Sequence, residues 1–210
     1  GIGLGVAVLI VVMSVMNGFR TELLNKIIGF NAHMTVKPYE NKIAKEKLDD
    51  QNLKSISESS IFSNSGEGIM IKKDITKGIL LRGYFAKDFS KLDIVNNGNF
   101  LGSENKLSNN SISISKELSF SLNLEIGDEI TLMSSSGVQT IIGNLPKQKK
   151  FTVASLFDSG VIDFDNNVAF INLVTLEEFF NLKPKKRNLE IYLKNPKNII
   201  IKINYTTIKK

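Results

Sequence analysis

The chain has 210 residues, of which 42% are apolar, and a formal net charge of +6. This length allows one domain or two small ones with a real core, and the apolar content is too low for a protein of many membrane spans. Cysteine is absent, which excludes disulfides, thiolate zinc sites and cysteine nucleophiles. The positive charge comes from scattered lysines without interleaved aromatic residues, which favours a solvated surface over a nucleic-acid site.

Residues 1–16 form an apolar run without a charged side chain. A spanning helix needs about 20 apolar residues, so the run is a little short. Two alternatives are a signal-peptide core, although no small-residue cleavage pattern follows, and a buried helix, in which sixteen residues without a charge would be unusual. The pattern favours a membrane helix. Gly1, Gly3 and Gly5 fit close helix packing in lipid better than a dinucleotide-binding loop, which needs a glycine where Val6 stands.

Beyond Met16 the apolar residues recur at helical spacing among polar ones. This spacing predicts that the helix continues as an amphipathic extension and stops at Gly29. Such a helix would be a rigid lever between a bilayer and the domain that follows. The apolar run includes the first residue, and an amphipathic pattern over 199–210 breaks off at the last one, so we expect a piece of a longer protein.

Residues 12–24, VMSVMNGFRTELL, resemble the first-helix signature of the LolC/LolE family of lipoprotein-releasing permeases. Neither hydrophobicity nor charge demands this order of residues, so the signature is specific. The resemblance implies an amino-terminal transmembrane helix, truncated at its start, in the bacterial inner membrane, with the main domain in the periplasm. The residues that carry the signature are Ser14, Met16, Asn17, Gly18, Phe19 and Arg20.

Residues 30–210 show mixed strand and helix patterns, which predict an α+β fold. A polar turn is expected around residues 74–78 and a loop over 96–110. Ser115 should cap one helix, and Thr175 and Glu178 should form a capping box that opens another. Strands are expected at 32–38, 69–72, 79–82, 112–114, 129–133, 151–157, 168–172 and 189–193, and helices at 42–57, 115–122, 175–182 and 199–210.

The order over 112–134 is strand, short helix, Leu-x-x-Gly-Asp and strand, which resembles the MacB-like periplasmic domain of the wider superfamily. This resemblance implies a division into porter and sabre subdomains. The expected parts are a transmembrane helix with its periplasmic extension at 1–29, the first half of the porter at 30–75, a sabre-like subdomain at 76–182, and a truncated second half of the porter at 183–210.

Residues 134–150 are the candidate functional segment. As a connection between two strands they far exceed the usual hairpin loop of about two to five residues. Apolar residues gather around Gly143 and Pro146, and an apolar tip is costly to expose. Composition alone leaves two alternatives open, contact with a partner or folding back onto the domain's own core. Lys147, Lys149 and Lys150 would attract an acidic rim on a partner.

Residues 140–149 read TIIGNLPKQK and share Thr140, Gly143, Pro146 and Gln148 with the pattern TPMGxxPxQR. The segment thereby resembles the hook of LolC-type permeases, a protruding hairpin that recruits the periplasmic chaperone LolA. Ile141 departs from the family pattern, which often has a proline at that place. Thr131 lies near a position where some members carry an arginine that contacts the chaperone. The hook residues implied by the resemblance are Thr140, Ile141, Ile142, Gly143, Leu145, Pro146 and Gln148.

The resemblance implies a permease subunit of an ABC transporter that extracts outer-membrane lipoproteins from the inner membrane. The implied partners are a separate LolD-type ATPase, a second permease subunit of the same or a sister type, LolA, lipoprotein cargo and the membrane, and not nucleic acid. The chain contains no phosphate-binding loop or nucleophile elbow and a single histidine, His33, so we expect no catalytic, cofactor or metal site. A MacB-like efflux or mechanotransmission permease and a membrane-anchored periplasmic scaffold without a transport role remain alternatives.

Overall fold

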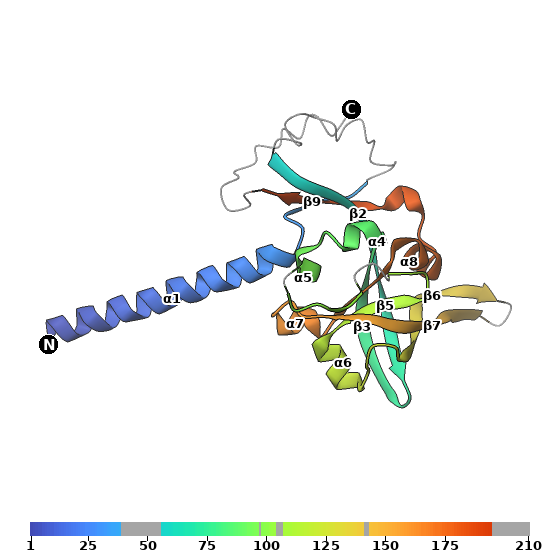
Figure 1. Cartoon of the computed structure of the whole chain (residues 1–210), viewed down its shortest axis with the longest axis horizontal. Helices are drawn as coiled ribbons and strands as arrows, with labels where there is room; N and C mark the ends of the chain where they lie inside the picture. Colours follow the sequence, from blue (N-terminus) through green and yellow to red (C-terminus); the bar gives the residue numbers. More distant parts are fainter. Residues whose placement is uncertain (39–55, 97, 104–106, 141–142, 195–210) are drawn as a thin grey trace.

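The computed structural model describes residues 1–38, 56–96, 98–103, 107–140 and 143–194. A long helix, α1 (Ile2–Phe30), projects from a mixed α+β domain (Figure 1). The other elements, in chain order, are β1 (Met34–Val36), β2 (Ser57–Lys72), β3 (Ile75–Tyr84), α4 (Ala86–Phe89), α5 (Asp93–Asn96), β4 (Leu101–Gly102), β5 (Ser111–Ser115), α6 (Lys116–Leu122), β6 (Glu129–Thr140), β7 (Gly143–Phe157), α7 (Ile162–Asp165), β8 (Val168–Asn172), α8 (Leu173–Phe180), the 3-10 turn η1 (Pro184–Lys186) and β9 (Asn188–Leu193).

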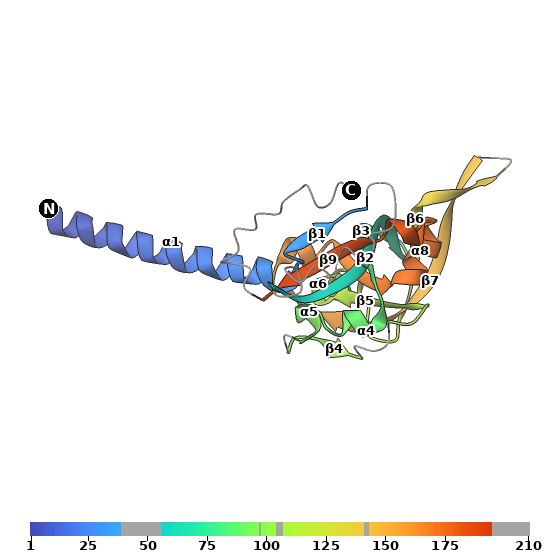
Figure 2. The same ribbon diagram turned by 90° about the horizontal axis from the view of Figure 1, so that it is seen from above.

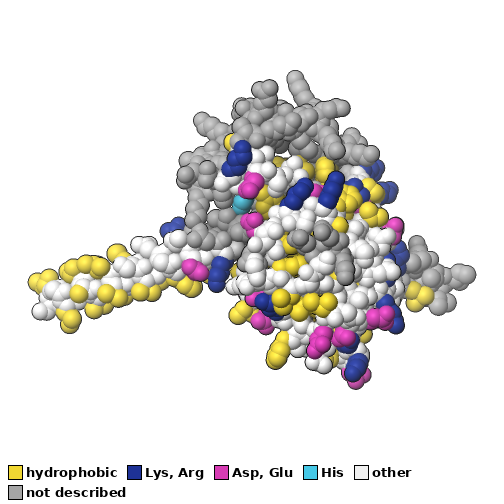
Figure 3. Space-filling view, in the orientation of Figure 1, with side chains coloured by type: hydrophobic (Ala, Val, Ile, Leu, Met, Phe, Trp, Pro, Cys, Tyr) yellow, Lys and Arg dark blue, Asp and Glu magenta, His cyan; other side chains and the backbone are white. Residues whose placement is uncertain are grey.

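Helix α1 begins with an apolar segment that the domain does not cover. Its segment Ile2–Leu23 has a mean hydropathy of 2.2 and is long enough to cross a membrane, and none of it is buried against the domain. Figure 3 shows its apolar side chains exposed along its length. A core helix would be covered by other elements, so the exposure argues against the buried-helix alternative and fits a membrane span. The predicted stop at Gly29 is one residue early, because the helix runs on to Phe30 and Asn31 follows in an extended conformation.

Six strands of the domain form a closed ring. Strand β2 pairs with β3 and β6, β3 with β8, β8 with β5, β5 with β7, and β7 with β6. The pairings β3–β8 and β5–β7 are parallel and the others are antiparallel. In a closed ring each strand forms backbone hydrogen bonds with a neighbour on both sides wherever the strands pair, so the ring has no unpaired strand edge there.

The main core lies inside this barrel. Each of the six strands contributes side chains that alternate with outward-facing ones, as the two-residue period of a strand requires. Helices α6 and α8 add apolar side chains to the same cluster. Its buried members are Met70, Ile79, Leu81, Ile112, Ile114, Leu118, Leu122, Leu124, Ile130, Leu132, Phe151, Val153, Ala169, Ile171, Leu176, Phe179 and Phe180.

A smaller sheet lies at the root of α1. Strand β9 pairs with β1 on one side and with Ser57–Ser63 of β2 on the other. The rest of β2, from Asn64 onward, belongs to the barrel. Because one long strand serves both sheets, the small sheet and the barrel are held together by continuous backbone.

Most predicted strands are confirmed, and β2, β3, β6 and β7 are much longer than predicted. The predicted strands 69–72 and 79–82 are parts of β2 and β3, which form a hairpin whose tight turn is Lys73–Asp74, with Lys73 at φ 52°. The predicted turn around 74–78 is therefore too long, because Gly78 lies inside β3 and pairs with Ile69. The strand at 32–38 shortens to β1, and the loop over 96–110 holds only the two-residue β4 among the described residues.

The two predicted helix caps have opposite outcomes. Ser115 caps α6 as predicted, since its hydroxyl accepts a hydrogen bond from the backbone N–H of Leu118 at 2.9 Å. The capping box at Thr175 and Glu178 is wrong. Helix α8 begins earlier, and its cap is Asn172, whose side-chain oxygen accepts from the N–H of Val174 at 3.0 Å. The chain leaves β8 directly into the helix, so the last strand residue takes the capping position.

Two further predicted helices, at 42–57 and 199–210, lie almost wholly or wholly outside the described residues.

Candidate functional site

Strands β6 and β7 extend past the barrel as a two-stranded hairpin. The last pairing of β6 with β2 is at Ser134, and the first pairing of β7 with β5 is at Thr152. Beyond these points β6 and β7 pair only with each other among the described residues, as far as Thr140 opposite Gly143. Figures 1 and 2 both show the hairpin projecting from the end of the domain opposite α1.

Most of the long loop expected from composition therefore consists of two hydrogen-bonded strands. Only residues 141 and 142, which lie outside the described residues, separate the two strands. The alternative that this segment folds back onto its own core is wrong for the described part, because Leu145 is 52% exposed and Pro146 is exposed too. Gly143, at φ +121°, has a backbone conformation that glycine adopts freely, which suits the start of the returning strand.

The base of the hairpin is irregular. The register shifts between Met133, which pairs with Gln148, and Gly137, which pairs with Pro146. Three residues of β6 thus face a single residue of β7, Lys147. A bulge of this kind bends the strand and increases its local twist, so it sets the direction in which the hairpin leaves the barrel.

Two side chains of β7 fasten the hairpin base to its surroundings, and a third contacts the paired strand β6. The Lys147 ammonium donates to the backbone carbonyl of Glu178 at 2.9 Å, and the Lys149 ammonium donates to the carbonyl of Asn109 at 3.1 Å. The Gln148 amide lies 3.6 Å from the sulfur of Met133. Glu178 is in the last turn of α8, where carbonyls lack helical partners, so Lys147 also satisfies a helix terminus.

An apolar groove of about 610 Å³ lies beside the hairpin base. Ile69, Leu80 and Met133 line it from three neighbouring strands, and Pro146 lines it from the hairpin. These side chains alternate in sequence with buried ones, which places the groove on the outer side of the barrel. An exposed apolar surface next to a projecting hairpin is suited to contact with another protein.

The structure distributes the predicted hook residues along this hairpin. Thr140 ends β6 and Gly143 begins β7, while Leu145, Pro146 and Gln148 follow on β7 and are exposed. Ile141 and Ile142 lie outside the described residues. Thr131 is half-buried on β6 and pairs with Lys150.

The signature residues of the first helix all lie within α1 and are exposed, namely Ser14, Met16, Asn17, Gly18, Phe19 and Arg20. The carbonyl of Asn17 accepts a hydrogen bond from the Thr21 hydroxyl at 2.8 Å. Lys26, further along the helix, lies 4.0 Å from the Glu22 carboxylate. The helix is continuous across the change from apolar to mixed sequence, as the lever interpretation requires.

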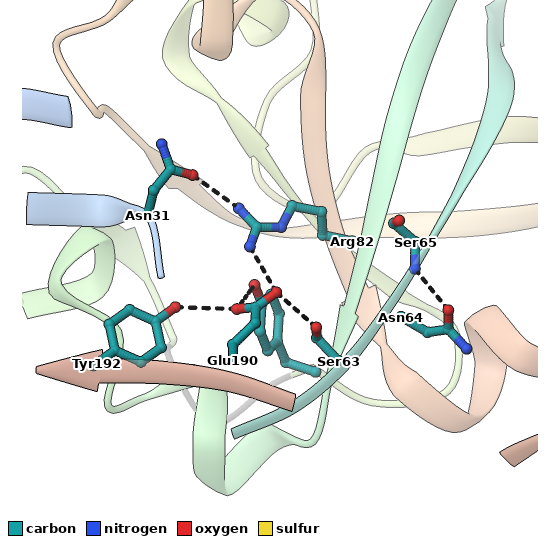
Figure 4. Close-up of polar contacts among 8 residues, drawn as sticks. Asn31, Ser63, Asn64, Ser65, Arg82, Glu190 and Tyr192 are labelled. Atoms are coloured by element: carbon teal, nitrogen blue, oxygen red, sulfur yellow. Dashed lines mark hydrogen bonds and ion pairs between the residues drawn. The ribbon is translucent and has the colours of Figure 1, made fainter. Parts of the chain in front are cut away.

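A buried polar cluster lies where α1 enters the domain, and sequence reasoning missed it. Glu190 of β9 accepts hydrogen bonds from Ser63 at 2.6 Å, Tyr84 at 2.7 Å and Tyr192 at 3.2 Å, and pairs with Arg82 at 2.9 Å (Figure 4). The Arg82 guanidinium also donates to the side-chain oxygen of Asn31, the residue that directly follows α1, at 3.4 Å. The cluster therefore ties the end of α1 to the strands on which the domain is built.

Burial and pairing compete within this cluster. Burial alone would raise the pKa of Glu190, but the charge of Arg82 and the hydrogen bonds from Ser63, Tyr84 and Arg82 outweigh it, and the pKa lies below its usual value. Burial also raises the pKa of Tyr84 and of Tyr192. At neutral pH Glu190 is thus a carboxylate and the two tyrosines are neutral donors, which is the only combination in which each group has a matching partner.

A second ion pair joins α8 to the start of β9. The Arg187 guanidinium donates to both carboxylate oxygens of Glu177, each at 2.7 Å, and lies 5.2 Å from the centre of the Phe85 ring. Glu177 is 5% exposed. The rarity of arginine in this lysine-rich chain is a sequence signal that could have indicated both pairs. Two of its three arginines, Arg82 and Arg187, pair with buried carboxylates.

A family model described as the MacB-like periplasmic core domain matches residues 1–204 of this chain. Among curated proteins, the lipoprotein-releasing system transmembrane protein LolC of Xylella fastidiosa (strain Temecula1) is 25% identical over 191 residues, covering 87% of this chain and 45% of the relative. The LolC of Neisseria meningitidis serogroup B is 27% identical over 209 residues, covering 94% of this chain and 49% of the relative. The LolC of Haemophilus influenzae is 26% identical, with 93% and 50% covered.

Among solved structures, the chain is similar to the periplasmic region of MacB from Actinobacillus actinomycetemcomitans, with a TM-score of 0.46 and 12% identity. That alignment covers 74% of this chain and 66% of the other. The chain spans about half the length of the curated relatives that it matches.

Proposed function

Because this chain belongs to the MacB-like periplasmic core domain family, we propose that it is part of a permease subunit of a bacterial ABC transporter. Helix α1 crosses the inner membrane and the domain stands in the periplasm. The subunit is non-catalytic, and a separate LolD-type ATPase hydrolyses ATP in the cytoplasm. A second permease subunit, of the same or a sister type, completes the membrane part. Support comes from the LolC relatives and from the length and exposure of α1.

In its specific form, the proposal is that the transporter extracts outer-membrane lipoproteins from the inner membrane and passes them to a LolA-type chaperone. The hairpin of β6 and β7 is the hook on which the chaperone docks. The observation that carries this proposal is the hairpin's position, since it stands free beyond the barrel at the end opposite α1. A soluble partner can reach it there, and the groove lined by Ile69, Leu80 and Met133 offers apolar area beside it.

The cluster around Glu190 has a role in the same proposal. A shift of α1 that follows ATP hydrolysis must reach the domain, and Asn31 is bonded to Arg82, which is paired with Glu190 on β9. The division into porter (30–75 and 183–210) and sabre (76–182) belongs to this proposal too. Strand β2 lies within the porter bounds, and from Asn64 onward it pairs with β3 and β6 of the barrel, so it would connect the porter to the sabre.

A crosslinking experiment tests the docking site. The photo-reactive residue benzoylphenylalanine replaces Leu145 in the full chain in detergent micelles, and purified LolA-type chaperone is added. The control places the same residue at Phe120, which is 89% exposed, on helix α6, which Figures 1 and 2 show away from the hairpin. We expect the chaperone adduct to form at Leu145 and not at Phe120. Equal adduct yields at the two positions would count against docking on the hairpin.

The alternative is a MacB-like efflux permease, which the family match favours equally. Replacing residues 135–146 by Asn-Gly leaves Ser134 opposite Lys147 and closes the ladder with a two-residue turn, so it removes the hairpin and keeps the barrel. In the living bacterium, lipoproteins retained in the inner membrane would support the first function. Normal sorting together with impaired export of drugs or toxins would support the alternative. Normal sorting and normal export would favour a scaffold without a transport role.

A further inference from the structure

A basic turn follows α8. The 3-10 turn η1 and the residues beside it read KPKKR, and Lys183, Lys185 and Lys186 are exposed. Elsewhere on the domain several lysines have carboxylate partners, for example Lys72 with Asp128 and Lys150 with Glu129. These three lysines have no ion-pair partner among the described residues. Three uncompensated positive charges within four residues make a concentrated field at one place on the surface.

The turn is held rigidly. Pro184 restricts the backbone at the first position of η1. Arg187, which follows the lysines, donates hydrogen bonds to both carboxylate oxygens of the buried Glu177. The Arg187 guanidinium also stacks on the Phe85 ring. A lysine cluster on a flexible tail would spread its charge over many positions, whereas this cluster keeps a fixed place on the domain.

The turn and the hairpin base are attached to the same helix end. Lys147, at the bulge of the hairpin, donates to the carbonyl of Glu178 in the last turn of α8, and Lys183 follows five residues later. Figure 1 shows α8 on the side of the domain from which the hairpin projects, away from α1. Figure 3 shows dark blue side chains gathered on the same side, above the hairpin. A protein docked on the hairpin would therefore meet this charge.

We propose that Lys183, Lys185 and Lys186 form an electrostatic docking surface for an acidic face of the soluble protein that engages the hairpin. This inference rests on the proposed function, because it assigns a second contact to the same partner. The apolar hairpin and groove hold the partner, and the lysines attract and orient it before contact. The structural alternative is a solvated lysine turn that contributes nothing to association, and the two differ in their kinetic consequences.

Charges at the rim of an interface change the association rate and its salt dependence more than the dissociation rate. Steering of this kind raises association rates by about 10-fold to 1000-fold at low salt. Three lysines are a modest patch, so we expect the lower end, about tenfold. The effect should fade between about 10 mM and 150 mM salt, because the screening length falls from about 30 Å to about 8 Å.

The test measures binding of purified LolA-type chaperone to the full chain in detergent micelles by stopped flow, at several salt concentrations. The test variant is K183Q/K185Q/K186Q. The matched control is K37Q/K73Q/K87Q, which removes the same number of exposed lysines elsewhere on the chain. A hairpin variant, Leu145→Asp, reports on the proposed docking site itself. Thermal unfolding of each variant checks that the domain is intact.

We expect the η1 variant to bind about tenfold more slowly at low salt, with a flatter salt dependence and a dissociation rate within about threefold of the parent. The control should bind like the parent. Equal association rates for the η1 variant and the control would overturn the inference while the hairpin still binds. If the parent chain does not bind the chaperone, or Leu145→Asp binds as well as the parent, the proposed function fails instead.

Discussion

Replacing Arg82 by methionine should destabilise the domain strongly. The side chains of Arg82 and Glu190 are 14% and 7% exposed, so their ion pair is buried rather than a surface pair. Removing one partner of a buried pair costs about 3–5 kcal/mol, because the remaining charge stays buried without compensation. Glu190 keeps three hydroxyl donors, from Ser63, Tyr84 and Tyr192, so we expect the lower end, about 3 kcal/mol.

The loss should depend on pH with a defined sign. In the parent, the pKa of Glu190 lies below its ordinary value of 4.5, so the stabilisation is complete above pH 4.5 and is lost as the pH falls through the lowered value. Without Arg82, burial is no longer outweighed and the pKa of Glu190 should rise above 4.5. The variant can then take up a proton on Glu190 at mildly acid pH, so its deficit relative to the parent should shrink between pH 7 and pH 4.5.

Urea unfolding of the chain in detergent micelles, followed by near-ultraviolet circular dichroism of its four tyrosines, measures both effects. The double variant R82M/E190Q serves as the control. It leaves neither charge buried, and the glutamine oxygen can still accept from the neighbouring hydroxyls, so it should recover more than about 1 kcal/mol of the loss. A deficit below about 1 kcal/mol for Arg82→Met, or one that is the same at both pH values, would refute this account of the cluster.

Three further substitutions test the packing of α8, each by urea unfolding. Gly66→Ala should lower the free energy of unfolding by about 1–3 kcal/mol, because the added methyl would lie 2.6 Å from the Phe180 ring. Adding Phe180→Leu should restore part of this loss. An unchanged free energy of unfolding would mean that the ring moves aside freely. Asn172→Ala should lower the free energy of unfolding by about 1 kcal/mol because it removes the helix cap, whereas Glu178→Ala should change it by less than about 0.5 kcal/mol. A larger loss for Glu178→Ala than for Asn172→Ala would support the capping box instead. Arg187→Lys should cost about 1–2 kcal/mol, because a single ammonium cannot reproduce the two-pronged contact, and an unchanged midpoint would contradict this.

Local patterns indicated several parts of the fold correctly. The strand, cap and helix at Ser111–Leu122 followed from alternating isoleucines and a serine at the capping position, because such signals act within a few residues. The helix beginning at Ile2 followed from the length of its apolar run. The composition of 134–150 predicted a long loop, whereas the structure forms a hairpin there, and its role as a docking site is a proposal.

The misplaced turn and the misplaced helix cap have one cause. A glycine or a threonine can serve in a turn, a cap, a strand or the core, and the residues that contact it in the fold decide which. Gly78 looked like a turn residue but lies in β3 because Ile69 pairs with it. Thr175 looked like a helix cap but is buried, with its hydroxyl bonded to the distant carbonyl of Asn109.

The sequence by itself determined an apolar amino-terminal helix, a mixed domain and a family signature, since each depends on residues close together in the chain. Only the tertiary structure decided that six strands close into a barrel, and that β6 and β7 extend beyond it as a hairpin. The same holds for Glu190, which meets Arg82 across 108 residues of chain at the root of α1. A buried charge demands a partner, but a one-dimensional pattern carries no information on which distant strand supplies it.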